Sequence, residues 1–164
     1  MEMKKLALAL LLAGSVHAAD VPIVGNVESK CVINTDVPGV YGNPTADVLS
    51  TASADGGVQP VIRYDVSLAG AYTAKITTPT SFSTSPALTD VVVWTGATEV
   101  SEVSDAAMSG YEAAKVTYDA TTEYDMTETG STWFIVSSSA SYGYGKAFPG
   151  GTYRAVVVAE CIAQ

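Results

Sequence analysis

The sequence predicts an all-β sandwich of about 8–10 short strands. Apolar and polar residues alternate with a period of two in several runs, as in strands with one buried face. Glycine, proline and asparagine separate these runs at short intervals, and no run is a convincing helix. No internal repeat or linker divides the chain, so we expect residues 19–164 to form one domain.

Residues 1–18 have the features of a secretory signal peptide. Lysines precede an apolar run over residues 6–14, and Val16-His17-Ala18 places small residues at the cleavage positions. We expect cleavage after Ala18, with Ala19 as the alternative. No apolar run reaches the ~18 residues that a membrane-spanning helix needs. The expected product is an exported chain without a membrane span, located in the periplasm, at the cell surface or outside the cell.

The first strand is expected over Ile23–Ile33, where the alternation places Cys31 on the buried face. Turn signals follow at residues 36–39 and 41–44. The next stretch is small and polar, and we expect it to be a surface loop with a short strand near Ala46–Ser50.

The alternation is cleanest from Ile62 to Leu68 and again from Tyr72 to Ile76. Ala69-Gly70 lies between these runs and favours a tight turn. The two strands are therefore expected to pair as a β-hairpin.

Asp90–Trp94 is apolar on both faces, which predicts a central strand that ends at Thr95-Gly96. A strand over residues 98–103 is expected to pair beside it. Residues 105–115 are compatible with a helix that Gly110 interrupts, and Tyr111–Tyr118 alternates equally well as a strand, so we expect a loop followed by a strand over residues 111–118.

Further strands are expected over Thr121–Met126 and Thr132–Ser137, followed by a loop over residues 138–149. Trp94 and Trp133 lie inside apolar runs and are expected in the core.

The closing strand is expected after Gly150-Gly151 and carries Cys161. Cys31 and Cys161 are the two cysteines of the chain. In an exported protein they are expected to form a disulfide, which joins the first and last strands. The bond closes a loop of roughly 130 residues, for which the chain-entropy model gives an upper figure of about 5 kcal/mol of stabilisation.

The sequence contains no recognisable catalytic machinery. Its one histidine, His17, lies in the predicted leader, which excludes Ser-His-Asp and Cys-His mechanisms and a histidine zinc site for the mature chain. No dinucleotide-binding or phosphate-loop motif is present. The formal net charge of −9 argues against nucleic acid as a ligand. We therefore predict a protein that is not an enzyme, with no catalytic residues, no metal site and no cofactor.

One acidic region keeps two alternatives open. It consists of Glu99, Glu102, Asp105, Glu112, Asp119, Glu123, Asp125 and Glu128. The favoured interpretation is a solvated acidic face, which also discourages edge-to-edge aggregation of strands. Carboxylates are also the ligands that calcium prefers, and two of them in a cleft can hydrolyse a glycosidic bond.

A loop of glycines and aromatic residues is the candidate binding surface. Tyr142, Tyr144 and Phe148 can stack on sugar rings or contact a partner protein if the loop presents them to solvent. The alternative is that the loop folds these rings over the end of the sandwich.

Four stretches carry a resemblance to a known family. Gly25-Asn26-Val27-Glu28-Ser29-Lys30-Cys31 resembles the opening of many pilins of the chaperone–usher type. Tyr41-Gly42-Asn43 together with Tyr72-Thr73-Ala74-Lys75-Ile76 is similar to the layout of the spore-coat-protein-U branch. Gly150-Gly151-Thr152-Tyr153 resembles the start of the final strand in that branch. The resemblance implies an incomplete immunoglobulin-like (Greek-key) sandwich that polymerises when a neighbour's N-terminal strand fills its groove.

The predicted disulfide bears on whether the sandwich is complete. A disulfide needs Cα atoms about 4.4–6.8 Å apart, whereas strands on either side of a missing strand are about 9–10 Å apart. Cys31 and Cys161 lie at similar depths in their strands, which favours parallel neighbours in a complete sandwich. A bond between opposing sheets is the alternative, and it would leave a groove open.

The sequence therefore predicts an exported, non-enzymatic structural subunit of a surface fibre, pilus or coat. Its expected partners are other copies of itself or surface-assembly proteins. The alternative is a secreted β-sandwich module that binds a carbohydrate or another surface ligand.

Overall fold

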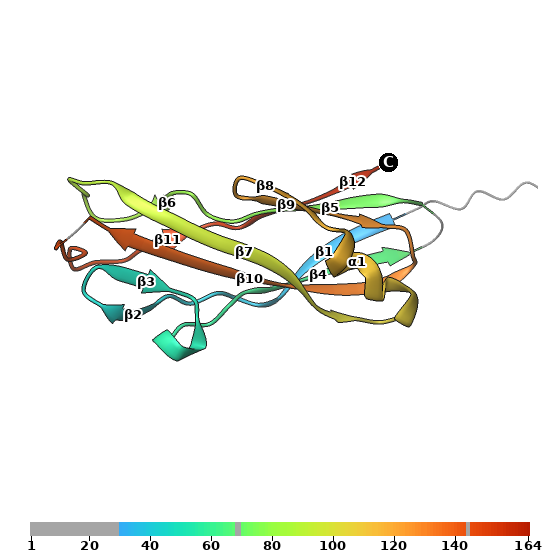
Figure 1. The fold of residues 1–164 in the computed structure, drawn as a ribbon, viewed down its shortest axis with the longest axis horizontal. Coiled ribbons are helices and arrows are strands. Elements are labelled where there is room, and N and C mark those ends of the chain that lie inside the picture. The colour runs from blue at the N-terminus through green and yellow to red at the C-terminus, as the bar shows by residue number, and fades with distance from the viewer. Residues whose placement is uncertain (1–29, 68–69, 144) are drawn as a thin grey trace, which may run out of the picture.

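Two antiparallel β-sheets pack face to face and form an elongated all-β sandwich, as the sequence predicts (Figure 1). The computed structural model describes residues 30–67, 70–143 and 145–164. The predicted signal peptide, the first residues of the predicted strand over Ile23–Ile33, and Tyr144 lie outside these residues. Within the described chain, no helix is long and apolar enough to cross a membrane.

The larger sheet is organised around its longest strand, β10 (Gly130–Tyr142), and is named the β10 sheet. One edge of β10 pairs along its length with β7 (Val92–Val103). Its other edge pairs first with β4 (Val61–Ser67) and then with β3 (Val48–Ser50). β1 (Lys30–Val37) lies beyond β4, and β2 (Gly42–Thr45) lies beyond β3.

The second sheet has the order β12–β5–β9–β8 and is named the β5 sheet. Its strands are β12 (Val158–Ala163), β5 (Tyr72–Thr77), β9 (Thr121–Met126) and β8 (Val116–Tyr118). A separate two-stranded sheet joins β6 (Phe82–Thr84) to β11 (Arg154–Ala155). The described chain has more strands than predicted because β2, β3, β6, β8 and β11 are each four residues or shorter.

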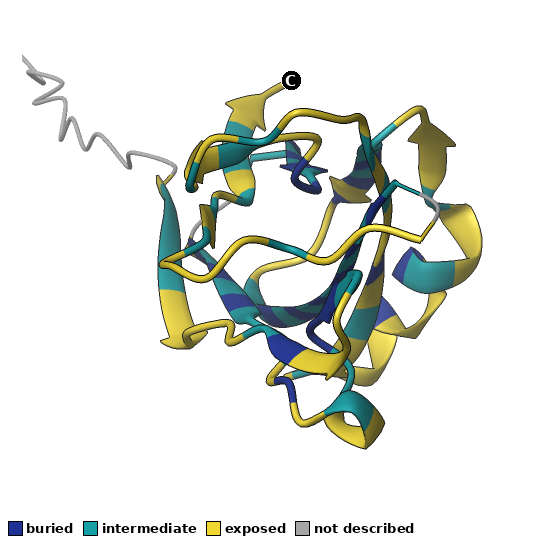
Figure 2. Cartoon of the chain, turned by 90° about the vertical axis from the view of Figure 1, so that its left-hand side faces the viewer, coloured by how far each residue is buried: buried dark blue, intermediate teal, exposed yellow. Residues whose placement is uncertain are grey.

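The core lies between the two sheets, and buried residues alternate along the strands that border it (Figure 2). Ile62, Tyr64 and Val66 of β4 face Tyr72, Ala74 and Ile76 of β5, and all are part of one buried cluster. Phe134 of β10 packs edge-on against the ring of Tyr64, with 5.3 Å between ring centroids. The period-two pattern therefore identified the inward-facing residues of these strands correctly.

The predicted hairpin between the strands near residues 62–68 and 72–76 is wrong, although both strands exist. β4 pairs with β1 and β10, whereas β5 pairs with β12 and β9 in the opposite sheet. Alternation reports only that one face of a strand is buried, and strands on either side of a sandwich share that property.

The prediction of a central strand over Asp90–Trp94 is also wrong. β7 is an edge strand that continues to Val103, so Thr95-Gly96 does not end it and residues 98–103 are part of the same strand. Val91 and Val93 are 71% and 60% exposed. The apolar residues on both faces therefore reflect an exposed valine pair rather than burial on both sides.

The prediction of a loop followed by a strand over residues 111–118 is correct only at its end, which forms β8, whereas residues 106–114 are helical. The chain forms a 3-10 helix, η2 (Ala106–Gly110), followed by one turn of α-helix, α1 (Tyr111–Ala114). The Asp105 carboxylate accepts a hydrogen bond of 2.8 Å from the Ala107 amide, which caps the first turn. Met108 and Tyr111 are buried in the core. This packing stabilises the two short helices, which the helix propensity of their residues alone does not predict.

Two smaller predictions also need correction. The turn expected over residues 41–44 overlaps β2, an edge strand, where Pro44 is tolerated because edge positions need no amide donor. Trp133 is not in the core but lies on the outer face of β10, where its indole donates a 2.8 Å hydrogen bond to Asp36. Its neighbour Phe134 occupies the inner face instead.

Candidate functional site

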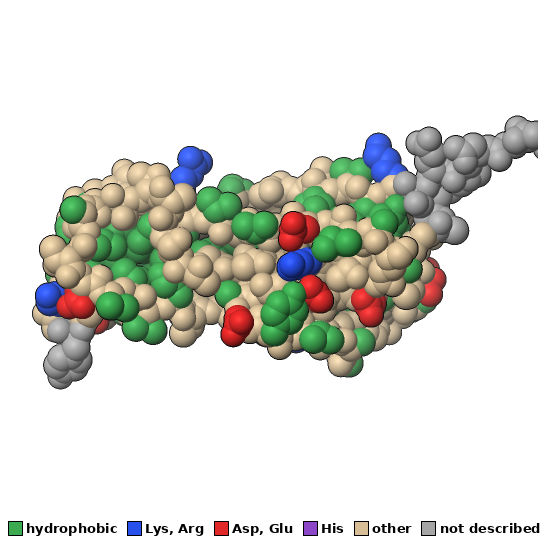
Figure 3. All heavy atoms as spheres, turned by 90° about the horizontal axis from the view of Figure 1, so that it is seen from above, with side chains coloured by type: hydrophobic (Ala, Val, Ile, Leu, Met, Phe, Trp, Pro, Cys, Tyr) green, Lys and Arg blue, Asp and Glu red, His purple; other side chains and the backbone are tan. Residues whose placement is uncertain are grey.

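A groove of about 1260 Å³ lies between the two halves of the sandwich in the described chain. One wall is formed by Thr35 of β1 and the segment Gly39–Tyr41 that follows it. The other wall is formed by residues 151–157, before and through β11. We name this feature the edge groove. Hydrophobic side chains gather in a hollow near the end of the molecule that carries β6 and β11 (Figure 3).

The Cys31–Cys161 disulfide closes the sandwich beyond one end of the edge groove. The bond is present as predicted, with 6.4 Å between the two Cα atoms. The preferred arrangement, with the first and last strands as parallel neighbours, is wrong because β1 and β12 belong to different sheets and do not pair. The bond joins opposing sheets, so the groove remains open from Thr35 and Val157 onward.

The floor of the edge groove combines apolar side chains with uncharged polar groups. Leu49 and Ile62 are buried side chains that line it. The Tyr41 hydroxyl lies 2.8 Å from the Ser138 hydroxyl, and burial raises the pKa of Tyr41 above its ordinary value. The Ser138 amide donates a hydrogen bond to the Thr51 hydroxyl, and the Ser138 carbonyl accepts hydrogen bonds from the amide and the hydroxyl of Thr51. These buried polar groups therefore all have partners. Arg154 is the one charged residue in the lining.

The second wall exposes main-chain groups toward solvent. Within the described residues, no main-chain hydrogen bond involves Val156 or Val157, which lie between β11 and β12. Val156 is 55% exposed. Unpaired main-chain groups at the edge of a groove are able to pair with an added strand.

An aromatic cluster holds this wall in place. It consists of Phe82, Trp94, Tyr142, Phe148 and Tyr153. The Phe148 ring stacks on Tyr142 at 5.2 Å between centroids and meets Tyr153 edge-on at 5.1 Å. Because β11 pairs only with the short strand β6, these contacts fix its position more than main-chain bonds do.

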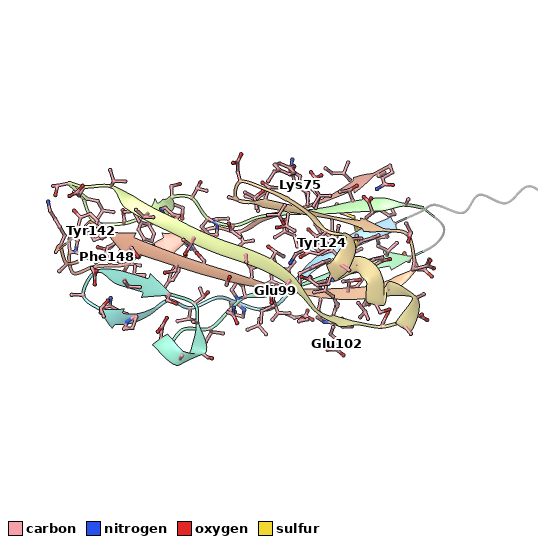
Figure 4. The ribbon with its side chains drawn as sticks, viewed as in Figure 1. Lys75, Glu99, Glu102, Tyr124, Tyr142 and Phe148 are labelled. Atoms are coloured by element: carbon pink, nitrogen blue, oxygen red, sulfur yellow. A yellow bond between two sulfur atoms is a disulfide. The ribbon has the colours of Figure 1, made fainter. Side chains whose placement is uncertain are left out.

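Two of the three predicted binding aromatics, Tyr142 and Phe148, have a packing role in the structure, and the third, Tyr144, lies outside the described residues. Tyr142 is the last residue of β10, is 4% exposed, and its hydroxyl accepts a 2.9 Å hydrogen bond from the Thr89 amide. These bonds to Thr89 lower the pKa of Tyr142. Tyr142 and Phe148 lie side by side at one end of the molecule (Figure 4). The sequence did not identify Phe82 and Tyr153 as their neighbours, because Phe82 lies in the three-residue strand β6 and Tyr153 in the segment before β11, neither of which has a periodic pattern.

The acidic residues are spread over several elements and several bind the chain itself. Glu112 accepts a 2.8 Å hydrogen bond from the Val100 amide on the free edge of β7 and pairs with Lys115. Asp125 accepts a 2.8 Å hydrogen bond from the side chain of Gln164. Among the described residues, no three acidic, histidine or cysteine side chains are grouped so that they could hold a metal ion.

Comparison of the chain with protein-family models, with curated proteins and with solved structures finds no match.

Proposed function

We propose that this protein is an exported, non-enzymatic structural subunit that assembles with other copies of itself into a surface fibre, pilus or coat. The observation that carries the proposal is the edge groove, an open apolar groove beside unpaired main-chain groups in an otherwise closed sandwich. The predicted leader and the Cys31–Cys161 disulfide support export to an oxidising compartment.

The dimensions of the edge groove fit one extended strand. Its walls run along residues 35–41 and 151–157. At about 3.3 Å per residue, a segment of about seven residues in extended conformation spans about 23 Å. An added strand would place alternate side chains on Leu49 and Ile62 and direct the others to solvent.

The segment that precedes β1 is the proposed occupant. With cleavage after Ala18, residues 19–29 remain ahead of the first described strand, which begins at Lys30. Val21, Ile23 and Val27 recur at odd positions of this segment, which is the pattern of a strand with one apolar face. Among the described residues, the pairing of β1 with β4 runs from Lys30 to Val37.

The positions of the groove and of the first strand favour exchange between copies. β1 begins near the disulfide, at the end of the molecule where β12 ends, whereas the edge groove lies toward β6 and β11 (Figure 1). A chain that filled its own groove would have to reverse direction at Lys30. A segment from a second copy makes a head-to-tail contact instead, and repeated contacts of this kind give an open filament.

Peptide binding to a truncated chain tests the proposal. We expect residues 30–164 to be monomeric and to bind a synthetic peptide of residues 19–29, whereas residues 19–164 form a series of higher masses in native mass spectrometry. Val40→Asp places a charge in the groove lining and is expected to abolish binding. Val93→Asp is the matched control, because Val93 is similarly exposed but lies outside the groove. The proposal would be contradicted if the mature chain stayed monomeric and the truncated chain bound no peptide.

A further inference from the structure

A second, smaller pocket lies at the seam where β7 of one sheet meets β5 and the β8–β9 turn of the other. It has a volume of about 400 Å³, within the range of about 300–1,000 Å³ that is typical of small-molecule sites. Trp94 and Gly96 line it from β7, Thr78 and Thr80 from the segment after β5, and Asp119 from the β8–β9 turn. We name it the seam pocket; Pro79 is the residue that it shares with the edge groove.

Close contacts between the two sheets fix the shape of the seam pocket. A Cβ atom at Gly96 would lie 2.8 Å from the Ser137 carbonyl oxygen and 2.9 Å from Cβ of Thr78, so only glycine allows this approach. The Ala120 carbonyl accepts hydrogen bonds from the Thr78 amide at 2.8 Å and from the Thr78 hydroxyl at 3.2 Å. The β8–β9 turn is thereby held against the end of β5.

Asp119 is held at the rim of the pocket in an unusual conformation. Its φ of 51° is in the left-handed region, and it is the only residue other than glycine with positive φ among those described. Its side chain is exposed, and it takes part in no ion pair or side-chain hydrogen bond within the described chain. Aspartate tolerates this conformation in a tight turn, so the turn holds an exposed carboxylate, unpaired within the described chain, at the rim of the pocket.

The chemistry of the lining identifies the class of ligand. Trp94, whose half-buried indole also packs against Phe82 at 4.7 Å between ring centroids, provides an apolar part of the lining, while Thr78, Thr80 and Asp119 provide hydroxyl and carboxylate groups. A sugar ring presents a flat face of C–H groups and a rim of hydroxyls, so it matches both parts. Asp119 and the net charge of −9 disfavour anionic ligands.

We propose that the seam pocket binds a neutral saccharide, with the sugar ring on Trp94 and its hydroxyls bonded to Asp119 and the threonines. Tyr142 and Phe148 do not line this site, although Trp94 also contacts Phe82 of the aromatic cluster, and the site does not depend on strand exchange in the edge groove. In a fibre of many copies, weak saccharide sites would act together and increase the overall affinity for a glycan-covered surface.

A glycan microarray of neutral and sialylated oligosaccharides, probed with the mature chain, is the first test. The neutral oligosaccharide that gives the strongest signal is then titrated by calorimetry against variants. Asp119→Asn retains a residue that tolerates positive φ and removes the charge, and Thr80→Val removes a hydroxyl. Each is expected to weaken binding at least about tenfold, which is about 1.4 kcal/mol. Glu128→Gln, an equal change of charge outside the pocket, is expected to bind as the unaltered protein does.

Thermal unfolding of each variant separates a loss of binding from a loss of folding. Binding of neutral saccharides that weakens in both pocket variants and not in the control supports the proposal. Three results would overturn it: no saccharide binds, only sialylated saccharides bind, or Asp119→Asn and Thr80→Val bind normally. Binding that is lost in Phe148→Ala but not in the pocket variants would also overturn it, because it would place the ligand beside Tyr142 and Phe148, which do not line the seam pocket.

Discussion

The hydroxyl of Tyr64 in β4 donates a 3.1 Å hydrogen bond to the main-chain carbonyl of Glu160 in β12 and so connects the two sheets through the core. Tyr64 has no exposed surface, and its ring packs against Phe134. The disulfide joins the same pair of sheets through the next residue, Cys161. A hydrogen bond at Glu160 and a disulfide at Cys161 therefore attach neighbouring residues of β12 to the β10 sheet.

We expect Tyr64→Phe to lower the free energy of unfolding by about 1 kcal/mol, since it removes one buried hydrogen bond and leaves the packing of the ring unchanged. Urea denaturation of the mature chain measures this difference. Tyr118→Phe is the control, because the Tyr118 ring is exposed and its hydroxyl bonds only the surface residue Glu123. Equal losses in the two variants would contradict the role of the Tyr64 bond.

Alkaline pH should unfold the protein through its buried tyrosines. Burial is the main cause that raises the pKa of Tyr64 and of Tyr124 above the ordinary value of 10.0. The unfolded chain then loses these protons at a lower pH than the folded chain does. The contribution of these two tyrosines to the free energy of unfolding is therefore fully present below pH 10, and it falls as the pH rises above 10. Urea titrations at about pH 8 to 11 should show this fall, with a smaller fall in Tyr64→Phe; a free energy of unfolding that is constant over this range would contradict the prediction.

Loss of the disulfide should be the largest single destabilisation. The bond encloses a sequence separation of 130 residues. For such a loop, we expect replacement of both Cys31 and Cys161 by serine to lower the free energy of unfolding by about 2–5 kcal/mol. Denaturation with and without reductant checks this, with the double-serine variant as the control that reductant should not affect. An unaltered protein whose stability is the same in both conditions would refute the expectation.

The sequence predicts strands better than their partners. Period-two alternation located β4, β5 and β9 because each buries one face, but it placed β4 and β5 in a hairpin although they lie in opposite sheets. The pattern contains the direction of each side chain and no information about which strand lies beside it. The two cysteines were enough to predict their pairing, yet their positions did not show that they join opposing sheets.

The candidate sites were harder to predict because each combines distant parts of the chain. The edge groove takes its walls from residues 35, 39–41 and 151–157, and the turn signals in these segments do not show that the two lie opposite each other. The seam pocket depends on the approach of Gly96 to Thr78, which is a consequence of how the sheets pack. The sequence did indicate aromatic residues at Tyr142 and Phe148, but only the structure shows that these rings pack against each other.

Removal of the Phe148 ring should loosen the wall of the edge groove without unfolding the sandwich. Phe148 is half-buried between Tyr142 and Tyr153, outside the main core cluster. We therefore expect Phe148→Ala to cost less than the about 3–5 kcal/mol of a core phenylalanine. Hydrogen exchange should become faster at Arg154 and Ala155 of β11, while the amides of β10 near Phe134 keep their protection, because β11 depends on the aromatic cluster and β10 does not. Phe148→Leu retains apolar volume and should show a smaller change. Faster exchange throughout β10, or none in β11, would mean that the cluster does not hold this wall.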